Sequence, residues 1–395
     1  FRRVLFRSYF RGTGGANIVL KTGQQGDLVF EGQGIANVVV NKVSHGTTTI
    51  EAKGVANVFI RQGNGKYNAN LLAMANISIM SGDNKERNKL YMLGGLNTHT
   101  HLGHGDNLWL AAGGLNLLTH QGNGNLTTSV AGGGNVITKI GNGNIKANML
   151  GMGNILTQIN QGDREKENHL WAIAVGGANI ITKQGVGDLQ AFMGGGLNVL
   201  THLGDGESLG LMVGGGNILT KVGHGNVSGI MLGLGNIFTQ IGDGRTIGIM
   251  GAAGNIFTKV GDGQIIAAML GGGNLFTHIG VGNTYAFMAG IGNIFTKVND
   301  SDNEDDVIAL MIAKANIFTQ IGHGTTVIVM AAKGNIATKV GNGCILNAML
   351  AVGNIFTHVG DGETFSIMLG KANVLTKVGD GFTAALLAGS ANILT

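Results

Sequence analysis

The sequence predicts an all-β fold in which short strands stack into a β-solenoid. Three observations lead to this fold class. Glycine accounts for 72 of the 395 residues and proline for none, with no collagen-like period. An Asn recurs at a nearly constant spacing along the whole chain. The segments between glycine clusters are rich in β-branched and aromatic residues, and none sustains a helical apolar period.

The repeat explains how such short segments build a core. Asn recurs twenty times, and most successive copies stand one 19-residue unit apart. In the typical unit 255–273, Ile256–Val260 predicts one strand and Gln264–Leu270 a second, each followed by a glycine turn. Such strands bury a core only when units stack. We expect about twenty stacked 19-residue Gly-rich repeats with two short strands per repeat, a rod of about 95 Å at 4.8 Å per coil.

The residue four positions after the Asn alternates between units. Lys stands in every second unit, as in the column Lys221, Gln240, Lys259, His278, Lys297, Gln320, Lys339, His358 and Lys377. In stacked coils, adjacent ammonium groups would repel, and a His or Gln spacer doubles their separation. A 38-residue unit whose halves face opposite ways would also produce this pattern. We favour one coil for each 19-residue unit.

The array has an irregular beginning and three long units. Phe1–Ser8 resembles a translated sequencing adapter, and we set it aside as an artefact. Residues 9–96 then form irregular first repeats, and residues 97–395 form regular repeats within one continuous array. The long units carry charged insertions that predict wet surface loops, at residues 81–89, 160–169 and 299–306. Because the chain stops within a repeat, we expect an internal fragment of a longer protein.

Charge and motifs exclude several functions. The net charge of +4 falls to +1 without the three arginines of Phe1–Ser8, and no Lys/Arg cluster predicts nucleic-acid binding. The single Cys344 excludes a disulfide framework. No phosphate-binding loop, nucleophile elbow or recurring catalytic pairing occurs. We therefore expect no enzyme activity, no cofactor and no small-molecule substrate.

The Asn column is interpreted as structural. Inward amides on stacked coils can hydrogen-bond to one another and to turn backbone, as in other stacked strands. The predicted ladder contains Asn217, Asn236, Asn255, Asn274, Asn293, Asn335, Asn354 and Asn373. The glycines beside this column are expected to supply positive φ angles in the turns.

Two ion-binding hypotheses are weaker. The turn between the strands reads Gly-Asp-Gly at Asp205, Asp243, Asp262, Asp361 and Asp380, which are weak calcium candidates. Elsewhere the central residue is Asn, His or Val, so oxygen ligands are too sparse for a calcium column, and calcium is not expected. His99, His101 and His104 cluster without a further ligand of suitable spacing, which favours a surface patch over a metal site.

The second strand is apolar on both sides. Ile247 and Ile249 point one way, and Gly248 and Met250 the other. One side can fill the core. The other side would be exposed, which predicts lateral self-association or membrane contact. The competing hypothesis is a flattened solenoid with a second buried layer.

Units such as GNIFTKVGDG (254–263) and ANVLTKVGDG (372–381) resemble the glycine-rich B-type repeats of the MARTX toxins, the multifunctional-autoprocessing RTX toxins of Gram-negative bacteria. The resemblance covers nearly everything from Gly14 onward, including the alternation of Thr-Lys with Thr-His or Thr-Gln. It implies a secreted toxin whose repeat arms engage the host plasma membrane and form a translocation structure that delivers effector domains. The charged insertions and the irregular units before Asn97 depart from the pattern.

We therefore predict a non-enzymatic repeat arm of a secreted toxin that acts at the host cell membrane. The alternative is an extracellular structural or adhesive rod. An ice-binding role would draw on the Thr column, but the paired Thr columns typical of that role are missing outside residues 98–101.

Overall fold

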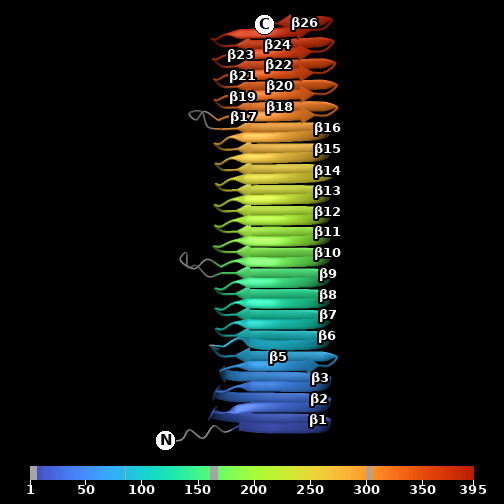
Figure 1. Ribbon diagram of the computed structural model, residues 1–395, viewed down its shortest axis with the longest axis vertical. Helices are drawn as coiled ribbons and strands as arrows, with labels where there is room; N and C mark the ends of the chain where they lie inside the picture. The colour runs from blue at the N-terminus through green and yellow to red at the C-terminus, as the bar shows by residue number, and fades with distance from the viewer. Residues whose placement is uncertain (1–6, 85, 161–167, 300–304) are drawn as a thin grey trace. The chain divides into compact units, whose positions relative to one another are not determined.

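The computed structural model describes residues 7–84, 86–160, 168–299 and 305–395, and all regular structure in these ranges is β-strand. The chain forms a parallel β-solenoid of about twenty turns, which confirms the predicted fold class (Figure 1). It divides into two compact units, Phe1–Leu197 and Asn198–Thr395, which are described separately. We call them the first and the second unit.

The strands of the first unit stack coil upon coil in chain order. They are β1 (Arg7–Gln25), β2 (Asp27–His45), β3 (Thr48–Asn64), β4 (Tyr67–Leu72), β5 (Ala75–Ser81), β6 (Asn88–Leu102), β7 (Asn107–Gln121), β8 (Leu126–Ile140), β9 (Ile145–Ile159) and β10 (Leu170–Gln184). Strand β11 (Leu189–Leu203) crosses from the first unit into the second.

The second unit continues with full-length strands and then with pairs of shorter ones. They are β12 (Ser208–Val222), β13 (Val227–Ile241), β14 (Thr246–Val260), β15 (Ile265–Ile279), β16 (Thr284–Val298), β17 (Val307–Ile312), β18 (Ala315–Ile321), β19 (Thr326–Ala331), β20 (Gly334–Val340), β21 (Ile345–Leu350), β22 (Gly353–Val359), β23 (Thr364–Leu369), β24 (Ala372–Val378), β25 (Thr383–Ala388) and β26 (Ala391–Leu394).

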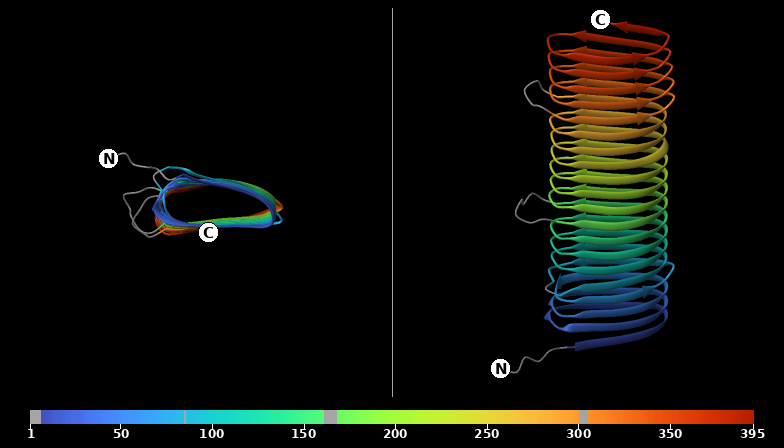
Figure 2. Two further views of the ribbon diagram at one scale, coloured as in Figure 1. Left: turned by 90° about the horizontal axis from the view of Figure 1, so that it is seen from below. Right: turned by 45° about the horizontal axis from the view of Figure 1, so that its top comes forward.

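Neighbouring coils pair in parallel with the register of the repeat. Asn236 on β13 pairs with Asn255 on β14, and Asn255 pairs in turn with Asn274 on β15. Each step along the stack therefore advances the chain by one 19-residue unit, and the 38-residue alternative is excluded. Figure 2 shows the coils as closed loops with two long sides.

Both predicted strands are present in every regular coil, but the second strand of one repeat is connected to the first strand of the next in two different ways. In β17–β26 they are separate, as in β17 and β18 around residues 313–314. In β6–β10 and β12–β16 they run together as one 15-residue strand, because the glycine segment between them stays extended and keeps pairing with its neighbours. These long strands end at the other turn of the coil, which in the regular repeats reads Gly-X-Gly.

The two glycine clusters serve different purposes, which corrects one expectation. Positive φ angles occur in the Gly-X-Gly turn, for example +119° at Gly261 and +125° at Gly263. The glycine segment beside the Asn column has none from Gly94 onward among the described residues. There the backbones of successive coils approach closely: a Cβ at Gly271 would lie 1.8 Å from the Ala252 carbonyl oxygen. Glycine at position 271 therefore serves close approach rather than φ, while the preceding coil holds Ala252 at the equivalent position.

The core is built from inward side chains of both long sides. Phe257 stacks on Phe276 with ring centroids 5.1 Å apart. A Cβ at Gly248 would lie 2.6 Å from the Phe257 ring, so the ring occupies the space that glycine leaves. Transfer of each Phe ring from water into the core contributes about 2–3 kcal/mol to the free energy of folding.

Candidate functional site

The Asn side chains form a continuous hydrogen-bonded ladder inside the second unit. Each Nδ2 donates to the Oδ1 of the Asn in the next coil, at 2.8–3.1 Å from Asn198 to Asn392. The second Nδ2 hydrogen is also used: Asn255 donates to the Leu270 carbonyl at 3.0 Å. Since both donors and the acceptor are satisfied, the buried amides incur no desolvation penalty from unpaired groups.

The alternating Lys, His and Gln residues also point into the interior. The interior contains four fully buried lysines, Lys221, Lys259, Lys297 and Lys339. They lie on the same inward-facing side of the strands as the Asn and Phe columns. Their ammonium groups donate to turn carbonyls of the preceding coil, as from Lys259 Nζ to Gly242 O at 3.0 Å. The Gly-X-Gly turn thus presents carbonyl oxygens inward, where they compensate for the lost hydration of each ammonium.

His278 adds a hydrogen-bond acceptor between two of these lysines. Lys297 Nζ lies 2.9 Å from His278 Nδ1, and His278 Nε2 lies 3.4 Å from the Gly261 carbonyl. A neutral His278 that carries its proton on Nε2 satisfies both contacts. A Lys in the place of His278 would offer no acceptor to Lys297.

A second alternation accompanies the first and was missed in the sequence. In the second unit, each His or Gln of this column is followed six residues later by a hydroxyl, so that His278 Nδ1 lies 2.9 Å from Thr284 Oγ1 and His358 Nδ1 lies 2.9 Å from Thr364 Oγ1. After Lys259 and Lys339 the same position holds Ile265 and Ile345. This co-variation between two positions was visible in the repeats and would have predicted an interior polar cluster.

Burial lowers the pKa of these groups. It lowers the pKa of Lys139, Lys259, Lys297 and Lys339 to about 8. The pKa of His278 falls to about 3, through burial first and then through the charge of Lys297. Burial likewise lowers the pKa of His358. The interior therefore holds charged lysines between neutral histidines near pH 7.

The third insertion reaches this interior with a carboxylate. Asp305 is buried, and its Oδ2 lies 3.4 Å from Lys297 Nζ and accepts a hydrogen bond from Asn299 Nδ2 at 3.0 Å. Residues 85, 161–167 and 300–304 of the expected surface loops lie outside the described residues. Among the described loop residues, Asp83, Glu86, Arg87 and Lys89 are exposed as expected, whereas Asn84, Asn168 and Asn299 are buried. No sequence signal distinguished the buried Asp305 from the adjacent, exposed Asp306.

The predicted histidine patch is wrong for two of its three members. His99 and His101 are buried, and only His104 is exposed. His99 replaces the inward Phe of the repeat and contacts Trp109 edge-on, with ring centroids 4.7 Å apart. His101 stacks on His120 at 4.8 Å. Both positions share the strand parity of the Asn column, which dictates their inward orientation.

The calcium candidates hold the turns together. The Asp243 carboxylate accepts a hydrogen bond from the backbone N–H of Asp262 at 2.8 Å, and Asp262 accepts one from Val281 at 2.8 Å. Asp205 and Asp361 make the same contact to the next coil, and Asp380 lies in the equivalent turn. Among the residues that the structure describes, no group of three His, Cys, Asp or Glu side chains is placed to hold a metal ion.

The outer surface of the second unit has two apolar faces. We call the outward positions one, three and five after each ladder Asn the Thr face; Ile256, Thr258 and Val260 are one row of it. Its central column is Thr201, Thr220, Thr239, Thr258, Thr277, Thr296, Thr319, Thr338, Thr357 and Thr376. We call the outward side of the other strand the variable face, which includes Ile249, Val329 and Ile367.

Neither face of the second unit carries a charge. Among its described residues, every Asp, Glu, Lys and Arg lies in a turn or in the interior. The aliphatic side chains that flank the Thr column are 37–46% exposed from Ile237 to Val359, except for the half-buried Val298. On the second strand, Ile249, Val329 and Ile367 are 42–45% exposed, so the hypothesis of a second buried layer over that strand is wrong for these residues.

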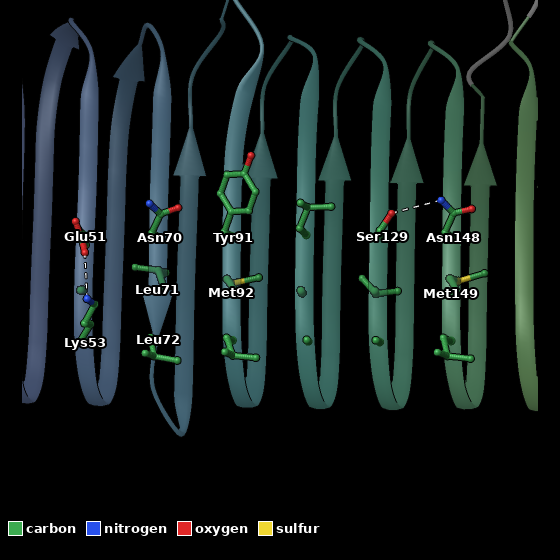
Figure 3. A pocket seen from close by; sticks show the side chains of 18 of the residues that line it. Glu51, Lys53, Asn70, Leu71, Leu72, Tyr91, Met92, Ser129, Asn148 and Met149 are labelled. Carbon is green, nitrogen blue, oxygen red and sulfur yellow. Dashed lines mark hydrogen bonds and ion pairs between the residues drawn. The ribbon is translucent and has the colours of Figure 1, made fainter.

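The first unit differs on its variable side. There Glu51 and Lys53 form an ion pair at 3.3 Å, and Lys89 and Lys146 also point outward. Glu51 and Lys53 border an open hollow of ≈ 880 Å³ that runs across several coils and is lined mainly by apolar residues such as Leu72 and Leu93 (Figure 3). The hollow is apolar, but charged side chains stand at its edge.

No helix long and apolar enough to cross a membrane occurs within residues 7–84, 86–160, 168–299 and 305–395.

Fold and interior together define the class: a Gly-rich parallel β-solenoid with a buried Asn ladder. The sequence model of the RtxA repeat matches fifteen segments, which cover more than half of the chain: residues 12–29, 52–66, 111–127, 131–145, 174–188, 193–210, 212–228, 231–248, 250–264, 269–286, 288–303, 311–328, 330–343, 349–366 and 368–382. The chain belongs to the RtxA repeat family, the repeat of the MARTX toxins. No curated protein and no solved structure matches it.

Membership in this family makes the chain a repeat region of an RTX toxin, and such a region implies a secreted protein. The family match indicates no catalytic domain.

Proposed function

We propose that this repeat region engages the host plasma membrane through the apolar exterior of the second unit and contributes to the structure that translocates effector domains. The observation that carries the proposal is the confinement of charge: Ile256 and Ile367 lie in faces from which every charged side chain is excluded. A charge held at membrane depth costs several kcal/mol, so this distribution suits contact with lipid.

The backbone supports the same proposal. Within the stack, the N–H and C=O groups of each coil pair with the coils before and after it, as between β13, β14 and β15. Such strands can leave water without leaving their backbone groups unpaired. The Thr hydroxyls are the only polar atoms in the regular rows of the Thr face, and they are uncharged.

Flotation with lipid vesicles tests this proposal. The chain is mixed with phosphatidylcholine–phosphatidylserine vesicles that contain a trapped dye, and both bound protein and released dye are measured. The double variant Ile256→Lys/Ile367→Lys places one charge on each apolar face and is expected to lose binding by about tenfold or more.

The matched control adds the same charge in the Gly-X-Gly turns. Gln264→Lys/Thr325→Lys uses the position that Arg245 occupies naturally, so it is expected to bind like the unchanged chain. Absence of binding by the unchanged chain would contradict the membrane role and favour a structural rod. Equal loss in both double variants would attribute the effect to net charge rather than to the faces.

A further inference from the structure

The two apolar faces of the second unit differ in regularity. On the Thr face, ten coils repeat one pattern of an aliphatic residue, Thr and a second aliphatic residue, from Val199–Leu203 to Val374–Val378. On the variable face, the outward residues range from Gly251 to Phe287 and Tyr285. The outward side chains of one face are therefore nearly identical from coil to coil, and those of the other face vary in size.

We propose that the Thr face is the docking surface for a second copy of this chain, which packs its own Thr face against it. Sheets that pack face to face lie about 10 Å apart and interdigitate their side chains. A partner with the same coil spacing of about 4.8 Å can align its Ile and Val columns with the grooves between Thr columns along the entire contact. Another copy of the same solenoid has this spacing by construction.

The regularity favours a protein partner over lipid at this face. Acyl chains are fluid and adapt to an uneven apolar surface as well as to a flat one, so lipid contact does not require identical rows. A rigid partner does require them, because one protruding side chain would separate the two surfaces along several coils. Phe287 on the variable face is such a protrusion.

The available area is sufficient for a stable pair. Ten coils at about 4.8 Å, each with about 17 Å of strand on this face, offer about 800 Å² per copy, which is the size of a standard protein interface. No charge must be desolvated, since the rows contain only aliphatic residues and Thr. The Thr hydroxyls lie along the centre, where they can hydrogen-bond across the contact, as Thr pairs do between strands.

Pairing through the Thr face leaves the variable face of both copies outward. The inference therefore goes beyond the proposed membrane role and does not depend on it. Self-association through the Thr face would occur in water. In the paired form, lipid contact would use the variable face, so the charge at Ile367 rather than that at Ile256 is expected to account for lost vesicle binding.

Sedimentation equilibrium of the full chain without lipid tests the pairing. We expect a dimer at micromolar concentration. Thr258→Lys/Thr338→Lys buries four charges in the apolar contact of the pair and is expected to weaken association by about a hundredfold or more. Thr258→Val/Thr338→Val preserves shape and is expected to remain dimeric. Strand content from circular dichroism shows whether each variant is folded.

The matched control is Ile249→Lys/Val329→Lys on the variable face, where both residues are similarly exposed. It is expected to stay dimeric. A monomeric unchanged chain at all concentrations, or equal dissociation in both Lys variants, would overturn the proposal. Vesicle flotation of the Thr258→Lys/Thr338→Lys variant is a separate measurement. We expect this variant to lose dimerisation and to retain vesicle binding. Loss of vesicle binding would contradict the membrane proposal and leave the pairing proposal unchanged.

Discussion

Two columns in the same interior follow opposite rules. The Asn column places the same residue in every coil, with Asn255 between Asn236 and Asn274. The neighbouring column never places two lysines in succession: His278 separates Lys259 from Lys297. An amide is both donor and acceptor, so identical copies satisfy one another. An ammonium only donates, and like charges repel, so it requires an acceptor between copies.

Removal of one amide from the ladder is expected to have the largest effect. Asn274→Ala deletes the bonds of its side chain to Asn293 and to the Ala289 carbonyl, and leaves the Nδ2 of Asn255 with one donor unpaired. We expect a loss of about 3–5 kcal/mol in unfolding free energy, from a cavity and several buried unpaired groups. Urea unfolding together with hydrogen exchange of β14–β16 measures it. Asn148→Ala, on the outer surface, is the control and should change stability little.

Disruption of the Lys–His alternation is expected to have the next largest effect on stability. His278→Lys would align three ammonium groups and remove the acceptor that Lys297 uses at 2.9 Å. We expect a destabilisation of about 2–4 kcal/mol that shrinks at pH above 9, where buried lysines lose their protons. His278→Gln is the matched control, because Gln240 and Gln320 hold the same position two coils away on either side. A stability of His278→Lys equal to that of His278→Gln would show that charge does not govern the column.

Acid should affect the alternating column and spare the Asn ladder. Burial lowers the pKa of His278 from its ordinary 6.5 to about 3 and that of His120 to about 3. Between these values the unfolded chain binds more protons, so stability falls as pH drops through this window, by at most about 1.4 kcal/mol per pH unit for each histidine. Unfolding free energies between pH 7 and 4 should show this slope, and His278→Gln should reduce it. A slope unchanged by His278→Gln would be inconsistent with a buried, neutral His278.

Replacing a buried lysine is expected to have the smallest effect near neutral pH. Lys259→Met removes one hydrogen bond, to Gly242 O at 3.0 Å, and also removes a desolvated charge. We expect a change of less than about 1 kcal/mol at pH 7, since the two contributions oppose each other. Because burial lowers the pKa of Lys259 to about 8, the unchanged chain gains stability as pH rises from 8 to 10.5, and the variant should gain less. A large loss at pH 7 would mean that the ammonium itself stabilises the fold.

The period of the repeat was enough to predict the fold class. The spacing of the Asn residues and the glycine turns implied stacked coils, and the parallel register confirms one coil for each 19-residue unit. Strand parity also predicts which polar residues turn inward. Lys259 and His101 share the parity of the buried Asn and Phe residues, yet their polarity favoured an outward or unassigned position. The carbonyl-lined turn that compensates a buried ammonium has no sequence signature.

Other features were beyond the sequence for physical reasons. Glycine can be required for a positive φ, as at Gly261, or for close backbone approach, as at Gly271, and composition does not separate the two. Asp305 could not be placed because its insertion interrupts the strand parity that orients the regular positions. The large-to-small match of Phe257 and Gly248 joins residues of adjacent repeats across the interior of one coil, a contact that depends on how β14 bends around the core.

The alternating column also constrains how such an array can change its length. Deleting the coil that contains His278 would bring Lys259 next to Lys297, and duplicating the coil of Lys259 would place two copies of that residue side by side. Gain or loss of two coils at once preserves every neighbour relation. The stack advances by one repeat at a time, but the alternation of side chains in this column repeats only every two repeats. Recombination among related arrays should therefore favour even differences in coil number.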